Sequence, residues 1–348
     1  MSLTVPALSA SGPDAPLEFT TVTRRDVGPH DVLIAIAYTG ICHTDIALLR
    51  NHWMEGLFPM VPGHEITGVV AEVGSEVTRH AVGDRVGVGC YVDSCRECPN
   101  CLDGEEQYCT KGEVITYGHL DYSGEVTYGG YSTHIVVDEH YVVRIPDGLA
   151  LDAAAPLLCA GITMYSPLKH WKAGPGRKVA IVGMGGLGHL GVRLAHGLGA
   201  EVTVLSQTLS KQDDGLRFGA DHYAATADPA TFTDLAGTFD LIINTVSAAA
   251  GLNQYLSLLR KDGVLVLAGV TGQPEPVLGV LLAARQVLTS TKNGSIRDTQ
   301  EMLDFCAAHG ITAQIETIAA DEVGAALDRL EKGDVRYRFV IDVSTFPR

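Results

Sequence analysis

The first part of the chain, up to about residue 150, alternates short apolar and polar stretches. Residues 31–40 and 134–146 are runs rich in Val and Ile that end at turn residues, and glycines interrupt the valine-rich stretch between them. Alternation with a period of two, broken by frequent turns, is typical of a compact and strongly bent β-barrel or sandwich. We therefore predict a β-rich first domain with little helix.

The pattern changes near residue 154. Residues 177–183 form an apolar run of buried-strand length, and the apolar positions after it recur at helical spacing up to Gly199. Four more strand-like runs follow the one at 201–206, and helix-like segments separate most of them. This alternation predicts a parallel, doubly wound sheet. The tail carries one helix and one late strand, at 298–311 and 335–343, which periodicity alone assigns to neither domain.

Length and charge narrow the function classes. A chain of 348 residues exceeds the size of a single hydrophobic core, so we expect two domains. The net charge of −16, without a basic block, disfavours a nucleic-acid partner. The start lacks a secretory pattern and the most apolar run, 277–284, is too short to span a bilayer, so we expect no membrane contact and a cytoplasmic location.

Three glycines stand where the strand at 177–183 turns into the following helix, in the pattern G-x-G-x-x-G. The first permits a tight turn, the second lets a pyrophosphate approach the backbone, and the third lets helix and strand pack closely. The alternative is a glycine turn in an ordinary α/β domain, but the surrounding βαβ pattern favours a dinucleotide site. The predicted contacts are Gly183, Gly185, Gly186, Leu187 and Gly188.

The end of the next strand indicates which dinucleotide is bound. A carboxylate there would hold the ribose 2′-hydroxyl of NAD, but this strand ends at Ser206. A carboxylate would repel the extra phosphate of NADP, whereas hydroxyls and a cation would bind it. Ser206, Thr208 and Lys211 therefore predict NADP, and the alternative is that they form a polar surface loop.

Half of the eight cysteines crowd into one short polar stretch. Cys95, Cys98, Cys101 and Cys109 follow the spacing C-x₂-C-x₂-C-x₇-C, which is typical of metal ligands. In a reducing compartment a metal site is favoured over disulfides. Four thiolates around Zn²⁺ leave no open position, so such a zinc would be structural and would order the lobe. An iron–sulfur cluster is the alternative, because four cysteines also hold iron.

A catalytic metal needs a different and incomplete ligand set. Three segments qualify: GICHTD with Cys42, PGHEITG with His64 and Glu65, and PLLCAGIT with Cys159. Taken singly, each also fits a buried thiol or a structural histidine. Their order, with the four-thiol lobe and GMGGLGH, resembles the zinc-dependent alcohol dehydrogenases of the medium-chain dehydrogenase/reductase superfamily. PLLCAGIT and Ser206 look most like its NADP-dependent, cinnamyl-alcohol-dehydrogenase-like branch.

The resemblance implies both fold and reaction. It implies a GroES-like catalytic domain at residues 1–153 and 293–348, with the zinc lobe near 90–110, and a Rossmann NADP-binding domain at 154–292. It also implies hydride transfer between NADP(H) and an alcohol/aldehyde pair, with reduction of aldehydes to primary alcohols as the expected direction. Two zinc ions per chain and a homodimer or homotetramer complete the expectation.

The resemblance also assigns roles to residues. Cys42, His64 and Cys159 would bind the catalytic zinc, with Glu65 as an alternating fourth ligand and Asp45 orienting His64. Thr44 would relay the proton of the alcohol. Cys90 and Cys306 match no ligand position and are assigned to packing. The other implied contacts are His43, Thr163, Val270 and Gly294 with the cofactor, and Trp53 and Val114 with the substrate.

Two features depart from the family pattern. Ala47 stands where many relatives have a proton-relaying histidine, so the proton of Thr44 would pass through a cofactor ribose hydroxyl to water, or through His43 or His52. Val114 and the polar run 290–293 replace the aromatic pocket of plant cinnamyl-type enzymes. We therefore expect a substrate other than a phenylpropanoid, and Lys292 indicates a polar group on it.

Three other interpretations compete with this one. A zinc-free reductase of the same superfamily would need neither Cys42 nor Cys159, and a polyol dehydrogenase would have a different ligand set. From another class, the four-thiol lobe could be a binding module beside a redox-sensing Rossmann domain. Metal content separates them, because two zinc ions per chain fit the dehydrogenase and one fits a reductase or a sensor.

Overall fold

The computed structural model describes residues 3–246, 251–269, 281–282 and 284–347. The chain divides into two compact units, Met1–Cys159 with Gly294–Arg348, and Ala160–Asn293. We call them the first and the second unit and describe each by itself. The sequence analysis placed the two junctions at 153/154 and 292/293.

A seven-stranded sheet organises the first unit, in the order β16-β17-β3-β4-β5-β9, with β8 also paired to β3. The central strand β3 (Asp31–Gly40) is mostly buried, and register shifts against β4 bend the sheet as the frequent turns predicted. The strand β17 pairs antiparallel with β3, so the tail of the chain belongs to this unit. The other strands of the sheet are β4 (Ile66–Val73), β5 (Arg85–Val88), β8 (His134–Asp138), β9 (Val143–Arg144), β16 (Ile315–Ile318) and β17 (Arg338–Asp342).

Smaller elements surround this sheet. The predicted strand at 134–146 is in fact β8 and β9 separated by a 3₁₀ turn, because Asp138 accepts a hydrogen bond from the backbone N–H of His140 and caps the turn. Two further pairs of strands are β1 (Leu3–Ser9) with β2 (Glu18–Arg24), and β6 (Tyr91–Asp93) with β7 (Val114–Ile115). The helices are α1 (His43–Leu49), α2 (Pro99–Leu102), α3 (Leu151–Ala154), α10 (Ile296–His309) and α11 (Val323–Glu331), and the 3₁₀ helices include η3 (Ala155–Leu158).

The second unit contains the predicted parallel sheet. Six strands lie in the order β12-β11-β10-β13-β14-β15, and every neighbouring pair is parallel. The chain starts at β10, adds strands on one side, and then returns to add strands on the other, which is doubly wound topology. The strands are β10 (Lys178–Val182), β11 (Glu201–Ser206), β12 (His222–Ala225), β13 (Phe239–Asn244), β14 (Leu259–Leu267) and β15 (Val287–Ser290).

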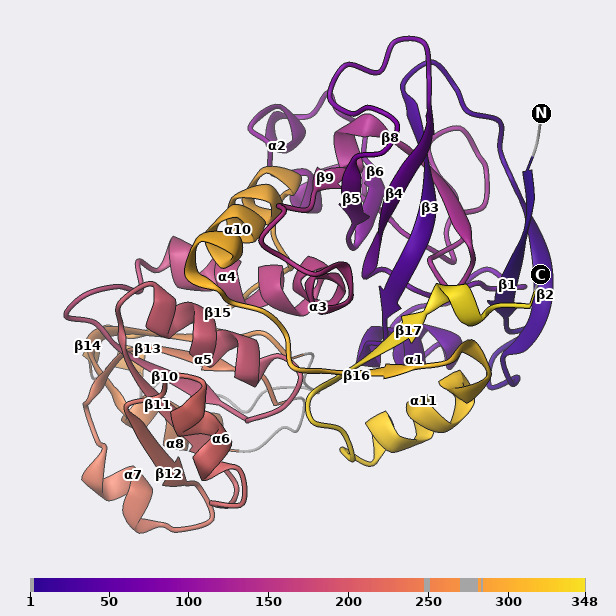
Figure 1. The fold of residues 1–348 in the computed structure, drawn as a ribbon. Coiled ribbons are helices and arrows are strands. Elements are labelled where there is room, and N and C mark those ends of the chain that lie inside the picture. The colour runs from indigo at the N-terminus through magenta and orange to yellow at the C-terminus, as the bar shows by residue number, and fades with distance from the viewer. Residues whose placement is uncertain (1–2, 247–250, 270–280, 283, 348) are drawn as a thin grey trace. The chain divides into compact units, whose positions relative to one another are not determined.

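Helices connect the strands of this sheet, and Figure 1 shows α5 and α6 beside β10, β11 and β12. They are α4 (Ala160–His170), α5 (Gly188–Gly197), α6 (Gln212–Arg217), α7 (Ala230–Asp234) and α8 (Leu252–Ser257). The strand β13, one of the two central strands, is buried along its whole length, as a sheet covered on both faces requires.

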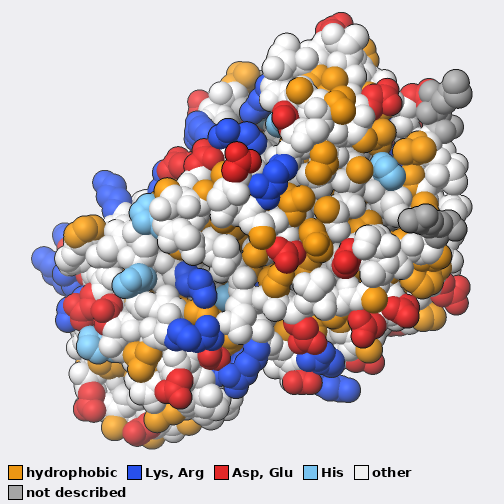
Figure 2. All heavy atoms as spheres, viewed as in Figure 1, with side chains coloured by type: hydrophobic (Ala, Val, Ile, Leu, Met, Phe, Trp, Pro, Cys, Tyr) orange, Lys and Arg blue, Asp and Glu red, His pale blue; other side chains and the backbone are white. Residues whose placement is uncertain are grey.

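The surface mixes both signs of charge. On the face in Figure 2, Lys and Arg side chains lie among Asp and Glu side chains and form no continuous basic surface. Among the described helices, none combines the length and the apolar character that crossing a membrane requires.

Candidate metal centres and cofactor site

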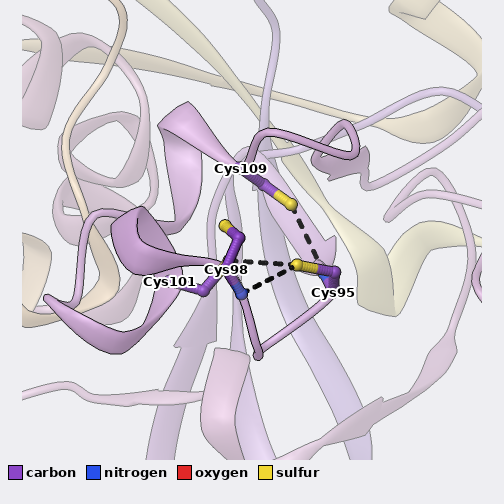
Figure 3. Close-up of side chains that lie close together, drawn as sticks. All are labelled: Cys95, Cys98, Cys101 and Cys109. Atoms are coloured by element: carbon purple, nitrogen blue, oxygen red, sulfur yellow. Dashed lines mark hydrogen bonds between the residues drawn. The ribbon is translucent and has the colours of Figure 1, made fainter.

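Four thiols converge in the loop around α2 (Figure 3). The sulfur atoms of Cys95, Cys98, Cys101 and Cys109 all lie within 4.8 Å of one another, as tetrahedral coordination of one ion requires. Cys95 is partly exposed and the other three are buried. We call this group the thiol lobe.

Backbone amides support the thiol lobe. The N–H of Cys98 points to Cys95 Sγ at 3.4 Å, and the N–H of Cys95 points to Cys109 Sγ at 3.5 Å. Hydrogen bonds from the backbone of Thr110 and Cys101 lower the pKa of Cys98 to about 5. Such donors favour thiolates, the form in which cysteine binds a metal.

A second group of residues that could bind a metal comes from three distant parts of the first unit. Cys42 is the N-cap of α1, His64 and Glu65 directly precede β4, and Cys159 follows η3. One ligand atom from each of these four buried residues lies within 4.8 Å of the others. The two sulfurs are 3.9 Å apart although 117 residues separate them in sequence. We call this group the buried centre.

The residues of the buried centre fit a metal ion. His64 Nε2 and Glu65 Oε2 are buried and have no hydrogen-bond partner among the described residues. A buried polar atom without a partner is costly, and coordination of a cation would satisfy both. Two thiols, an imidazole and a carboxylate are a donor set that zinc prefers.

Asp45 lies against His64. Its carboxylate is fully buried, and Asp45 Oδ1 lies 3.3 Å from His64 Nδ1. Burial alone would lower the pKa of His64, but the Asp45 carboxylate outweighs this effect and raises it. A carboxylate behind a ligating imidazole fixes the orientation of the ring.

The side chain of Glu65 lies between Arg338 and Gly40. Arg338 of β17 donates to Glu65 Oε1, and both side chains are buried. Burial raises the pKa of Glu65 to about 7, against the opposing effect of Arg338. On the other side, a Cβ added to Gly40 would lie 1.9 Å from Glu65 Oε2. The absence of a side chain at Gly40 therefore makes the room for this carboxylate.

The other predicted residues of this region occupy different environments. Thr44 Oγ1 lies 3.5 Å from Cys42 Sγ, beside the buried centre, whereas His43 is exposed. Trp53 is 46% exposed, and Val114 is buried in the small β6–β7 sheet.

The two cysteines assigned to packing behave differently. Cys306 is fully buried in α10, with its sulfur 3.6 Å from Met302 Sδ. Cys90 is only partly buried. Hydrogen bonds with Cys42 and then with Cys90, together with burial, raise the pKa of Cys159. Cys90 therefore lies next to the buried centre.

The glycine motif of the second unit lies at the turn from β10 to α5. Gly183 has a φ of +91°, which glycine adopts without strain, and a Cβ on Gly188 would lie 1.9 Å from the carbonyl oxygen of Gly183. A Cβ on Gly185 would meet nothing within 4 Å. The turn is therefore tight at its first and third glycines and open at its second, as the approach of a pyrophosphate requires. Gly186 and Leu187 complete it, with Leu187 as the N-cap of α5.

Of the residues predicted to select NADP, Lys211 contacts this turn. β11 ends at Ser206, and Lys211 Nζ donates to the carbonyl oxygen of Met184, between the first two glycines, at 3.0 Å. Thr208 is exposed and hydrogen-bonds to Ser210.

Three further cofactor contacts were expected. Thr163 Oγ1 accepts a hydrogen bond of 2.8 Å from Asn293 Nδ2, within the second unit. Gly294 is buried at the start of the returning tail. Val270 lies outside the described residues.

Three residues around the buried centre were missed by the sequence analysis. Tyr117 and Tyr131 donate their hydroxyl hydrogens to Asp45, and Arg338 pairs with Glu65. They lie 72, 86 and 273 residues from the side chains that they contact, and no local spacing marks them.

Comparisons with known proteins show the family of the chain. Residues 28–147 match the alcohol dehydrogenase GroES-like domain and residues 186–308 match the zinc-binding dehydrogenase family. The chain is 59% identical to a probable formaldehyde dehydrogenase of Bacillus subtilis, covering 97% of each protein. It is also 59% identical to the NADP-dependent alcohol dehydrogenase C 1 of Mycolicibacterium smegmatis, covering 98% of this chain and 99% of that one.

Solved structures give the same result. A cinnamyl alcohol dehydrogenase of Sorghum bicolor superposes with a TM-score of 0.96 at 42% identity, covering 99% of both chains. A cinnamyl alcohol dehydrogenase of Helicobacter pylori, complexed with NADP(H), superposes with a TM-score of 0.93 at 38% identity over the whole of both chains.

The chain therefore belongs to the zinc-dependent alcohol dehydrogenases of the medium-chain dehydrogenase/reductase superfamily. It is an oxidoreductase with a GroES-like domain and a Rossmann domain, as the sequence predicted. This class displaces the interpretations as a zinc-free reductase and as a binding module.

Proposed function

We propose that this enzyme uses NADPH to reduce aldehydes to primary alcohols at the buried centre. The observation that carries the proposal is the convergence of Cys42, His64, Glu65 and Cys159, with His64 Nε2 and Glu65 Oε2 left unpartnered. Cys42, His64 and Cys159 would hold a catalytic zinc ion, and Glu65 would be a fourth ligand that alternates between the metal and Arg338. The thiol lobe would hold a second, structural zinc ion.

The residues in and around the buried centre would have different roles in the reaction. When bound, zinc supplies a Lewis acid that polarises a carbonyl and lowers the pKa of an alcohol. Asp45 keeps the imidazole of His64 oriented, and the hydrogen bond that Cys42 N–H donates to Asp45 Oδ2 holds the first thiolate at the start of α1. Thr44 is within 3.5 Å of Cys42 Sγ, where its hydroxyl can exchange a proton with the substrate oxygen.

The second unit would bind NADP(H). The glycine turn receives the pyrophosphate, while Ser206, Thr208 and Lys211 form the site of the 2′-phosphate. Thr163, Val270 and Gly294 would lie along the nicotinamide, and His43 would also contact the cofactor. An enzyme 59% identical to this chain is named NADP-dependent, which supports the choice of cofactor. A Ser206→Asp variant should shift the preference toward NAD, and unchanged NADP selectivity in kcat/KM would refute this assignment.

The substrate is an alcohol or aldehyde other than a phenylpropanoid. The run 290–293 and Val114 provide no aromatic ring, and Trp53 is the aromatic residue assigned to the pocket. Lys292 would favour a substrate with a polar or anionic group. We also propose that the enzyme is cytoplasmic and forms a homodimer or homotetramer.

The test is a panel of aldehydes and alcohols followed by NADPH absorbance, with and without a zinc chelator, on protein whose zinc content is measured. Two zinc ions per chain, with chelator-sensitive aldehyde reduction, support the proposal. Full activity after complete removal of metal would overturn it.

A further inference from the structure

The Asp45 carboxylate is the most heavily hydrogen-bonded group beside the buried centre. It is fully buried and accepts four hydrogen bonds, from Cys42 N–H at 2.8 Å, Gly63 N–H at 3.3 Å, Tyr117 Oη at 2.6 Å and Tyr131 Oη at 3.1 Å. An ionised carboxylate has about four lone-pair positions, so its capacity is filled without water. Its contact with His64 Nδ1 is a fifth interaction on Oδ1.

Two of the four donors to Asp45 are backbone N–H groups, and the other two are the hydroxyls of Tyr117 and Tyr131. Tyr117 and Tyr131 are themselves 1% and 0% exposed, so water cannot replace a lost hydroxyl without rearrangement. A buried carboxylate that loses a donor becomes costly and moves toward its remaining donors. Because His64 Nδ1 shares Asp45 Oδ1 with Tyr117, such a movement changes the support of the imidazole.

Both tyrosines also contact the segment that contains His64. The N–H of Tyr131 donates to the carbonyl oxygen of Pro62 at 2.9 Å, and a Cβ on Gly63 would lie 2.6 Å from the Tyr131 ring. The ring centroid of Tyr117 is 5.9 Å from that of His64. The two rings therefore pack around the residues that precede and include His64.

A buried arginine fixes the loop that presents Tyr131. Arg24 donates to the carbonyl oxygen of Gly129 at 2.8 Å and to Ser132 Oγ at 2.6 Å, on either side of Tyr131. Hydrogen bonds from a charged donor are stronger than neutral ones and hold a loop in one position. Tyr131 is thus positioned by rigid backbone rather than by its hydroxyl alone.

We propose that Tyr117 and Tyr131 are positioning residues of the buried centre, which hold the Asp45 carboxylate against His64 and so fix the imidazole for the metal. The inference rests on the proposed function, because it requires a metal at the buried centre. It adds two residues, from segments far from the ligands in sequence, to the support of that metal.

The test uses the variants Tyr117→Phe, Tyr131→Phe and the double variant in the zinc-loaded enzyme. The rate at which each zinc ion passes to a chromophoric chelator is measured well below the melting temperature. We expect the double variant to release the zinc of the buried centre roughly 10–100-fold faster, the usual cost of losing support behind a ligand. Tyr117→Phe should have the larger single effect, because its hydrogen bond is the shorter.

The matched control is Tyr141→Phe. Tyr141 is equally buried in the same unit, but its hydroxyl donates to Ser94 Oγ at 2.7 Å, and Ser94 lies beside Cys101 of the thiol lobe. This control should leave the buried centre at the wild-type rate. Cobalt bound at the buried centre gives an independent readout, because a change in the orientation of His64 shifts its visible absorption bands.

If the two tyrosines act through Asp45, the effects of changing the tyrosines and of changing Asp45 on metal release should not be additive. In an Asp45→Asn background, the two Tyr→Phe changes should produce no further acceleration of metal release. Wild-type release rates and an unshifted cobalt spectrum in the double variant would overturn the inference, as would additive effects in the Asp45→Asn background. If the wild-type buried centre binds no metal, the proposed function itself fails, which is a distinguishable result.

Discussion

The thiol lobe and the buried centre each bring four candidate metal ligands together, but they do so in opposite ways. The four cysteines of the thiol lobe come from fifteen consecutive residues, and backbone N–H groups of the same loop support them. The buried centre takes its four candidate ligands from residues 42 to 159, and side chains of the folded unit support them. A closed local site orders its own loop, whereas a site assembled by the fold can keep one position free for chemistry.

Removing a ligand of the buried centre should have the largest effect. Cys159→Ser takes away one of three proposed catalytic ligands while the unit keeps its sheet and its thiol lobe. We expect kcat/KM to fall roughly a thousandfold or more, since polarisation by the metal is worth several kcal/mol. Steady-state kinetics and zinc analysis together check this. Near-normal activity with one zinc ion per chain would contradict the distinction between the two sites.

Removing a ligand of the thiol lobe should instead affect local order. Cys98→Ser should lose the structural zinc ion and expose the segment 90–112 to protease, because the lobe has little apolar core of its own. Limited proteolysis with mass spectrometry locates the cleavage, and we expect activity to fall by roughly tenfold, less than in Cys159→Ser. Protease resistance equal to that of the wild type would show that the lobe needs no metal.

Gly40→Ala tests the buried centre without changing a ligand. The added methyl group would overlap Glu65 Oε2, so Glu65 must move and release of the buried zinc should accelerate roughly tenfold. The matched control is Gly324→Ala in α11, where a Cβ meets nothing within 4 Å. Equal release rates in the two variants would show that Glu65 does not contribute to holding the zinc ion.

Acid should empty the buried centre. A ligand must give up its proton to bind metal, so affinity is present above the pKa of the ligand and is lost as the pH falls through it. Burial raises the pKa of Glu65 to about 7, and the Asp45 carboxylate raises the pKa of His64 against the effect of burial, so both groups take up protons at a pH near neutral. Zinc retained at the buried centre after dialysis at stepwise lower pH should therefore fall below about pH 7. Full retention down to about pH 4, where an ordinary glutamate takes up its proton, would be inconsistent with this expectation.

The smallest expected effect concerns the proton relay, which only the buried centre needs. Ala47→His introduces the proton-relaying histidine that the family resemblance leads us to expect at this position, and we expect a change in rate of a few-fold with a new inflection near pH 6.5. Ala47 is 6% exposed, so the melting temperature must be measured alongside the pH–rate profile. An unchanged profile in a folded variant would mean that Thr44 passes its proton by another route.

The same contrast explains what the sequence could predict. The thiol lobe and the glycine turn follow from spacing alone, because their chemistry is local, and the parallel sheet follows from apolar runs such as 239–246. Tyr117, Tyr131 and Arg338 could not be found in this way, since nothing in their neighbourhoods indicates a partner far along the chain. The strand predicted at 134–146 is interrupted because the Asp138 cap competes with β pairing there.

The most direct test of the account is an anomalous diffraction map at the zinc edge, from crystals of active enzyme. We predict a peak within about 2.3 Å of Cys42 Sγ and Cys159 Sγ and bonded to His64 Nε2, and a separate peak inside the thiol lobe. A map with a peak at the thiol lobe and none among Cys42, His64 and Cys159 would contradict the account.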